Sequence, residues 1–151
     1  MIAIIQRVSR ASVVADGVLS GSISGGLMIL LGVGEGDTEA EAELLARKTA
    51  ALRIFCDEND KMNLSLTDIG GAALVVSNFT LLADTKKGNR PSFTGAMEPK
   101  EADRLYNYYC SLLAEGGIKK VEKGVFGADM KIDLCCDGPV TITLNTDTWR
   151  K

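Results

Sequence analysis

The chain has 151 residues, of which 46% are hydrophobic and 25% are charged, and its formal net charge is −3. These values are typical of one globular domain, and they argue against a disordered chain or one that binds nucleic acid over most of its surface. The sequence contains no histidine, which excludes Ser-His-Asp and Cys-His catalytic triads and argues against most zinc hydrolases.

The N-terminal third of the chain is predicted to form β-strands at residues 2–7, 11–15 and 18–23. Asp16-Gly17, between the last two, is typical of a hairpin turn. Residues 27–33 are apolar at nearly every position, so we expect a central strand that is buried on both faces. Because this run is too short to cross a bilayer and the four cysteines lack CxxC spacing, we expect a cytoplasmic protein with no membrane segment.

Two helices are predicted in the remainder of the chain. Thr38 to Glu41 match a capping box, which marks the start of the first helix. The second should begin at Glu98-Pro99 and end at Gly116-Gly117, with apolar residues recurring every three or four positions between them. Short strands are expected at residues 53–55, 131–135 and 140–145. The sequence therefore predicts one α/β domain over residues 1–151, a mixed, curved β-sheet packed by two main helices.

Two loops have the composition of binding loops but lack the residues that binding requires. Residues 32–37 place three glycines between a strand and a helix, but the third glycine is one position too early for a dinucleotide-binding motif. Two acidic side chains there would also repel a pyrophosphate. Residues 57–60 are acidic, yet Met62 and Asp68 occupy the positions where a calcium-binding EF-hand loop needs glycine and glutamate. We interpret both segments as ordinary turns.

The strongest functional signal lies between Val75 and Phe93. A buried strand leads into a tip rich in hydroxyl and amide side chains, and a compact basic loop pinned by glycine and proline follows it. The cations of this loop are Lys86, Lys87 and Arg90. This arrangement predicts a site for a partner that carries phosphate groups.

The hydroxyl groups of Ser77 and Thr80 are candidate nucleophiles, but no histidine or lysine base lies at motif spacing from them. A hydrogen-bonding role is therefore favoured over a covalent one, and a site built from backbone groups fits the same residues. Gly138-Pro139 lies between two predicted strands. Spacing alone favours a tight turn there, and the alternative is a rigid, cis dipeptide whose carbonyl groups face a ligand.

Together these segments resemble the D-aminoacyl-tRNA deacylases, and the resemblance extends over nearly the whole chain. The matching segments are Gln6-Arg7-Val8-Ser9-Arg10-Ala11, Lys61-Met62-Asn63-Leu64-Ser65, residues 77–93, Gly124-Val125-Phe126-Gly127-Ala128-Asp129-Met130 and Gly138-Pro139-Val140-Thr141. The resemblance implies the fold of that family and a cytoplasmic homodimer. It also implies hydrolysis of the ester between a D-amino acid and the 3′-terminal adenosine of tRNA, action on glycyl-tRNA, and no metal or organic cofactor.

The resemblance also assigns roles to individual residues. Ser77, Asn78, Phe79 and Thr80 correspond to the family's Ser-Gln-Phe-Thr motif, which lines the pocket for the aminoacyl-adenosine. We expect the backbone amides near Phe79 and Thr80 to stabilise the oxyanion while a positioned water attacks the ester, with the ribose 2′-hydroxyl taking part. Asn78, which replaces the usual glutamine, would contact the substrate.

The remaining expected contacts come from distant parts of the chain. Gly138 and Pro139 would reach into the partner subunit's site, and Arg7 would hold them there. The residues expected near the substrate are Ala96, Phe126 and Met130, and those expected to bind tRNA are Lys86, Lys87 and Arg90. Cys136 stands where the family commonly has asparagine.

Two other functions are compatible with the sequence. One is a small-molecule esterase or amidase with Thr80 as nucleophile. The other is a non-catalytic module that binds the end of tRNA, in which Asn78 has disabled the site. Release of D-tyrosine from D-Tyr-tRNA would distinguish these alternatives.

Overall fold

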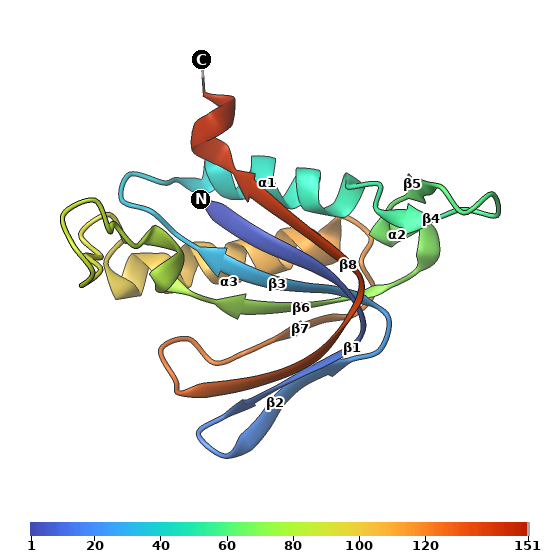
Figure 1. Cartoon of the computed structure of the whole chain (residues 1–151), viewed down its shortest axis with the longest axis horizontal. Helices are drawn as coiled ribbons and strands as arrows, with labels where there is room; N and C mark the ends of the chain where they lie inside the picture. The colour runs from blue at the N-terminus through green and yellow to red at the C-terminus, as the bar shows by residue number, and fades with distance from the viewer. Residues whose placement is uncertain (151) are drawn as a thin grey trace.

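The computed structural model describes residues 1–150, which form one curved, mixed sheet with two long helices on one side (Figure 1). The strands are β1 (Ile2–Ala15), β2 (Val18–Ile23), β3 (Gly26–Gly32), β4 (Phe55–Cys56), β5 (Met62–Leu64), β6 (Ala72–Ser77), β7 (Val121–Lys123) and β8 (Met130–Asn145). The helices are α1 (Glu39–Ala51), α2 (Leu66–Ile69) and α3 (Pro99–Glu115), with single 3₁₀ turns at η1 (Phe79–Leu82) and η2 (Thr146–Trp149). The expected α/β fold class is confirmed.

The sheet is nearly closed on itself. Its strand order is β2-β1-β3-β6-β7, and β8 pairs with the opposite edge of β1. β1 is antiparallel to β2, β3 and β8, whereas β3, β6 and β7 are parallel to one another. The curl brings β2 to β7, where the Ser20 hydroxyl donates a hydrogen bond to the Lys123 carbonyl oxygen at 2.7 Å.

Two long strands occupy the positions where pairs of short strands were predicted. β1 is continuous because residues 2–8 pair with β3 and residues 11–15 pair with β2, while β8 runs along its other edge. β8 is continuous as well. The tight turn that spacing alone favoured at residues 137–139 was wrong: these residues bulge out within β8, opposite Arg7, because both halves of β8 pair with the same neighbour.

The two predicted helices are confirmed: the first at its start and the second at both ends. Thr38 caps α1: its hydroxyl accepts a hydrogen bond from the Ala40 N–H, and the Glu41 carboxylate accepts one from the Thr38 N–H at 2.7 Å. α3 has Pro99 at its first position and Gly116 at its C-cap. The short strand predicted at residues 53–55 instead lies at Phe55–Cys56, where it pairs with β5.

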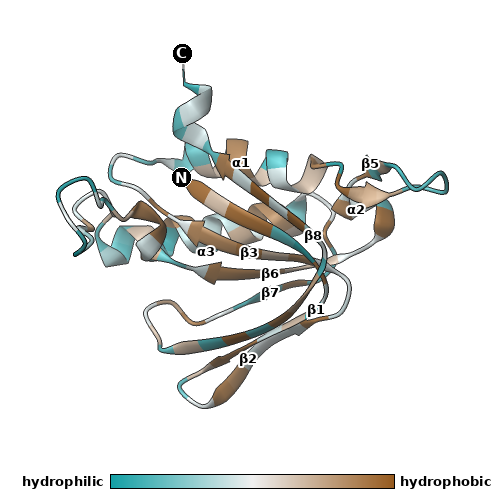
Figure 2. Ribbon diagram, in the orientation of Figure 1, coloured by the Kyte–Doolittle hydropathy of each residue, from teal (hydrophilic) through white to brown (hydrophobic). Residues whose placement is uncertain are grey.

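α1 and α3 lie side by side over one face of the sheet, and the main core fills the space between these layers (Figure 1). Leu45 of α1 and Leu105 of α3 are fully buried there against Ile29 of β3 and Val75 of β6. A smaller core lies on the inner side of the curved sheet. Its buried residues are Val8, Ala11, Val13, Ile23, Met28, Leu74 and Val76. Figure 2 shows β3 and β6 as the most continuously hydrophobic strands. The two cores thus hold the ends of β3 and β6 in place.

Candidate active site

A cavity of about 750 Å³ opens where the parallel strands β3 and β6 end. It is lined by Leu31 and Val76 from the strand ends, by the loop before α3 with the start of that helix, and by the segment between β7 and β8. In α/β sheets, the carboxyl ends of parallel strands are the usual position of ligand sites. The cavity is therefore the candidate active site.

The tip of β6 is shaped by Asn78. Its backbone N–H donates to the Leu31 carbonyl oxygen at 2.8 Å, which extends the pairing with β3 by one residue. Its side-chain carbonyl oxygen accepts hydrogen bonds from the Thr80 N–H, at 3.2 Å, and from the Thr80 hydroxyl. These bonds start η1. Ser77, Asn78 and Phe79 line the cavity, whereas Thr80 lies outside the lining.

η1 packs directly against the end of β3 at Gly32. A Cβ atom added there would lie 2.7 Å from Leu82 Cδ2, 3.0 Å from Leu81 Cβ and 3.1 Å from the Asn78 carbonyl oxygen. The contact with the end of the Leu82 side chain is shorter than real Cβ contacts, and those with Leu81 and the Asn78 backbone are tighter than most of them. The absence of a side chain at Gly32 therefore sets the position of η1 and of the Asn78 tip.

Aromatic rings form much of the cavity wall. Phe79 and Phe93 meet edge to face with ring centroids 5.0 Å apart. The ring centroids of Tyr106 and Phe126 are 6.2 Å apart. The Tyr106 hydroxyl donates to the Val75 carbonyl oxygen at 2.7 Å, and burial raises the pKa of this phenol well above its usual value. Tyr106 therefore stays protonated at neutral pH and cannot act there as a general base.

The other ionisable side chain of the lining is Glu98. Its carboxylate accepts hydrogen bonds from the N–H groups of Lys100, at 3.1 Å, and Glu101, at 2.7 Å, and so caps α3. Within residues 1–150, no group of three or more His, Cys, Asp or Glu side chains could hold a metal ion. Beside the Glu98 carboxylate, which caps α3, the cavity offers backbone groups, a hydroxyl, an amide and apolar surface for binding and chemistry.

The structure gathers six of the predicted site residues around this cavity: Ser77, Asn78, Phe79, Ala96, Phe126 and Met130. Phe93 and Tyr106 line it as well but were not predicted to. Phe93 is the last residue of the 77–93 segment. Its position in that segment could have predicted a place in the site. Tyr106 follows the helical period of α3, so its pattern indicated core packing alone.

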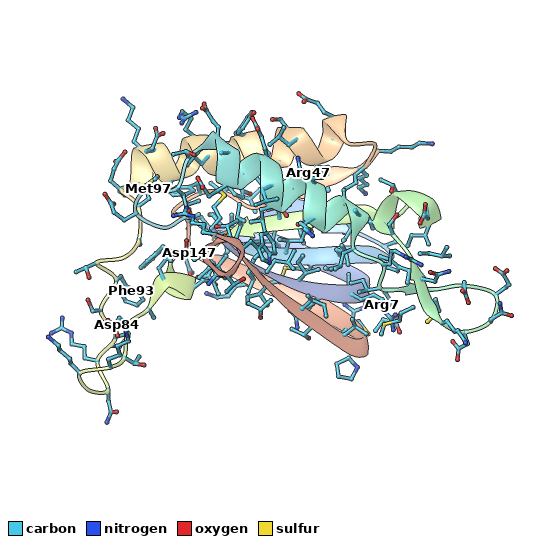
Figure 3. The ribbon with its side chains drawn as sticks, turned by 90° about the horizontal axis from the view of Figure 1, so that it is seen from above. Arg7, Arg47, Asp84, Phe93, Met97 and Asp147 are labelled. Carbon is cyan, nitrogen blue, oxygen red and sulfur yellow. The ribbon has the colours of Figure 1, made fainter. Side chains whose placement is uncertain are left out.

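Arg7, Gly138 and Pro139 form a second group, outside the cavity lining. Figure 3 shows Arg7 far from Phe93, which lines the cavity. The Arg7 Nε donates to the Asp137 carbonyl oxygen at 3.0 Å, and its Nη1 donates to the Ile54 carbonyl oxygen at 2.7 Å. The Gly138-Pro139 peptide bond is cis. A Cβ on Gly138 would lie 2.6 Å from the Val140 nitrogen, and its φ of +140° favours glycine. Arg7 thus joins the bulge of β8 to the segment that leads into β4.

Lys86, Lys87 and Arg90 form a third group, on an exposed loop. Two backbone hydrogen bonds between Asp84 and Ser92, of 2.8 and 2.9 Å, close the base of this loop. In Figure 3 the loop projects beyond Phe93, with its long side chains directed into solvent. The three cations are therefore free to contact a ligand at that end of the molecule.

Comparison with known proteins assigns the family. The model of a family described as D-Tyr-tRNA(Tyr) deacylase matches residues 4–145, a range that contains all three groups of site residues. The chain belongs to this family. The D-aminoacyl-tRNA deacylase of Koribacter versatilis is 54% identical over 143 residues, which cover 95% of each chain. That of Yersinia pestis (strain Pestoides F) is 55% identical over 144 residues, covering 95% of this chain and 99% of its own.

A solved structure has the same fold over nearly the whole chain. The c-Myc DNA unwinding element binding protein superposes with a TM-score of 0.90 and 39% identity, covering 96% of this chain and 98% of its own. The expected family is confirmed.

Within residues 1–150, no helix is both long and apolar enough to span a membrane.

Proposed function

We propose that the chain hydrolyses the ester bond of D-aminoacyl-tRNA to free D-amino acid and tRNA, and that it also accepts glycyl-tRNA. The observation that carries this proposal is the cavity at the ends of β3 and β6, lined by Ser77, Asn78 and Phe79 in a chain of the deacylase family. The proposed role is chiral proofreading during translation. The free state of the four cysteines supports a cytoplasmic location.

The cavity lining favours catalysis by positioned backbone groups. A water adds to the ester carbonyl carbon, the bond to the ribose 3′-oxygen breaks, and a proton passes to that oxygen. The adjacent ribose 2′-hydroxyl is placed to assist this transfer. Because Asn78 already accepts the Thr80 N–H, we assign the oxyanion chiefly to the Phe79 N–H. The Thr80 hydroxyl is likewise bonded to Asn78, which supports a positioning role over a nucleophilic one.

Chiral selection is assigned to Gly138 and Pro139 acting from a partner subunit. In D- and L-aminoacyl esters, the amino group and the side chain exchange places around one carbon. A rigid wall can reject the L-form by steric exclusion alone, while glycine, which has no Cβ, passes. Arg7 supports this assignment because it bonds the bulge at the Asp137 carbonyl oxygen and is itself anchored to the Ile54 carbonyl oxygen.

The direct test measures amino acid release from D-Tyr-tRNA, L-Tyr-tRNA, Gly-tRNA and a free D-tyrosine ester. We expect turnover of D-Tyr-tRNA and Gly-tRNA, with little of the other two. Rapid hydrolysis of the free ester together with a trapped acyl-enzyme would support a Thr80 esterase instead. Binding of tRNA without any release would indicate a non-catalytic module.

A further inference from the structure

The ring of Phe79 is exposed at the rim of the cavity. The residue is 58% accessible, although most large apolar residues of the chain are buried. The ring is supported from one side, since Phe93 meets it edge to face at a centroid distance of 5.0 Å. A large aromatic ring held beside a cavity with an open face is a surface on which a planar group can stack.

The same support connects Phe79 to the basic loop. Phe93 directly follows Ser92, whose backbone forms both hydrogen bonds with Asp84 at the base of that loop. Figure 3 places Phe93 and Asp84 together at one end of the molecule. Among residues 1–150, no carboxylate pairs with Lys86, Lys87 or Arg90. An exposed ring beside the cavity and three unpaired cations on the adjoining loop therefore lie at the same end of the molecule.

This combination matches the chemistry of single-stranded RNA. Proteins bind unpaired nucleotides by stacking bases on aromatic rings while cations follow the phosphates. We propose that Phe79, supported by Phe93, stacks against the base that precedes the terminal adenosine of tRNA. This inference rests on the proposed function, which places the terminal adenosine and its ester inside the cavity. The charge of the neighbouring loop favours RNA over an apolar surface of a second subunit.

The test separates the terminal adenosine from the nucleotide before it. The substrates are D-tyrosyl-adenosine, D-tyrosyl-cytidylyl-adenosine and D-Tyr-tRNA, and the measured quantity is kcat/KM for ester hydrolysis. The variants are Phe79→Leu and Phe93→Leu, with Phe79→Tyr as the conservative variant that keeps an aromatic ring. Leu19→Ala removes a similarly exposed apolar side chain, 61% accessible, at the β1–β2 hairpin, and is the matched control.

Stacking predicts a loss that depends on substrate length. For Phe79→Leu, kcat/KM should fall about tenfold further on the dinucleotide and on tRNA than on D-tyrosyl-adenosine, as expected for one base–aromatic stack. Phe93→Leu should give a smaller loss with the same pattern, and Phe79→Tyr should restore the wild-type ratio. Because no charge is removed, the slope of log Kd for deacylated tRNA against log salt should not change.

Equal losses on all three substrates would overturn the inference, because they would assign the ring to cavity structure alone. Equal losses accompanied by dissociation of the protein into monomers would assign the ring to an interface between copies. Wild-type protein that releases no D-tyrosine from any substrate would instead overturn the proposed function.

Discussion

At the residue scale, the role of Asn78 depends on which of its atoms are already bonded. Its side-chain oxygen accepts two hydrogen bonds from Thr80, so the amide NH₂ group is the part left for the substrate. The side chain is one methylene shorter than the glutamine common in the family. This shorter length suits it to accept a hydrogen bond from the backbone N–H two residues later in the chain. In this chain, Asn78 therefore shapes the tip of β6 as well as lining the cavity.

Replacement of Thr80 tests whether its hydroxyl positions groups or forms a bond to the substrate. Thr80→Ala removes one hydrogen bond to Asn78 but keeps the bond from the backbone N–H. We expect kcat on D-Tyr-tRNA to fall by about tenfold or less, the effect of roughly 0.5–1.5 kcal/mol, and Thr80→Ser to be close to wild type. Loss of all turnover in folded protein would indicate a covalent nucleophile, whose deletion costs many orders of magnitude.

At the element scale, two short segments carry the site on a rigid sheet. η1 sits against Gly32 with no space for a side chain between them. The basic loop is closed by the bridge between Asp84 and Ser92. Both are attached to β3 and β6, whose inner residues are buried in the cores. Each segment can therefore be changed by a local substitution without disrupting the sheet.

Gly32→Ala should displace η1 and lower activity more than stability. The added methyl group meets Leu82, Leu81 and the Asn78 backbone within about 3 Å, so η1 and the Asn78 backbone that borders the cavity must move to make room for it. We expect at least a tenfold loss of kcat/KM, since small displacements of catalytic groups are costly. Gly25→Ala is the matched control, because a methyl group there meets nothing within 4 Å. Equal activity of the two variants would contradict this account of η1.

Neutralising the basic loop should weaken binding to every tRNA alike. Lys86→Ala, Lys87→Ala and Arg90→Ala together should reduce the slope of log Kd against log salt by about one unit for each phosphate that the loop no longer neutralises. A triple alanine variant at Lys61, Lys119 and Lys120, which are exposed elsewhere, makes the same change in net charge. If both triple variants lower the slope of log Kd against log salt equally, the effect comes from overall charge. The loop is then not the surface that binds tRNA.

At the scale of the whole molecule, one subunit keeps its site residues in separate places. The cavity holds Ser77 and Phe79, whereas Gly138 and Pro139 are exposed on the bulge of β8, outside the cavity lining. A two-fold dimer presents the same surface of each copy to the other, so it can bring the bulge of one copy to the cavity of its partner. This geometry supports the proposed homodimer.

The dimer predicts twice the chain mass of 16.1 kDa in light scattering, and it predicts complementation between two inactive variants. Gly32→Ala damages the cavity, and Gly138→Ala damages the bulge because its Cβ would meet the Val140 nitrogen. In a co-expressed mixture, each heterodimer has one intact site built from the two undamaged halves. Random pairing should restore roughly a quarter of wild-type activity. An active monomer, or no recovery in the mixture, would refute a site shared between subunits.

Local sequence signals predicted the starts of the two long helices, the end of α3 and the central strand. Each of these signals predicts structure only within a few residues of its own position. Examples are the capping box at Thr38, the proline at position 99 and the apolar run of residues 27–33. The motif from Ser77 to Thr80 was placed correctly at the tip of a buried strand. These features depend on backbone sterics, capping bonds and burial of one face, all of which neighbouring residues determine.

Only the tertiary structure decided how these elements meet. It joined the halves of β1 and of β8 into single strands, turned residues 137–139 into a bulge, and brought Phe93, Tyr106 and Phe126 to one cavity. Hydrophobic periodicity shows that a face is buried but not which distant segment buries it. The sequence by itself thus determined which segments become strand or helix and the chemistry that the chain carries. The cavity arose from contacts between residues far apart in sequence, because only packing of the sheet against α3 and the loops determines those distances.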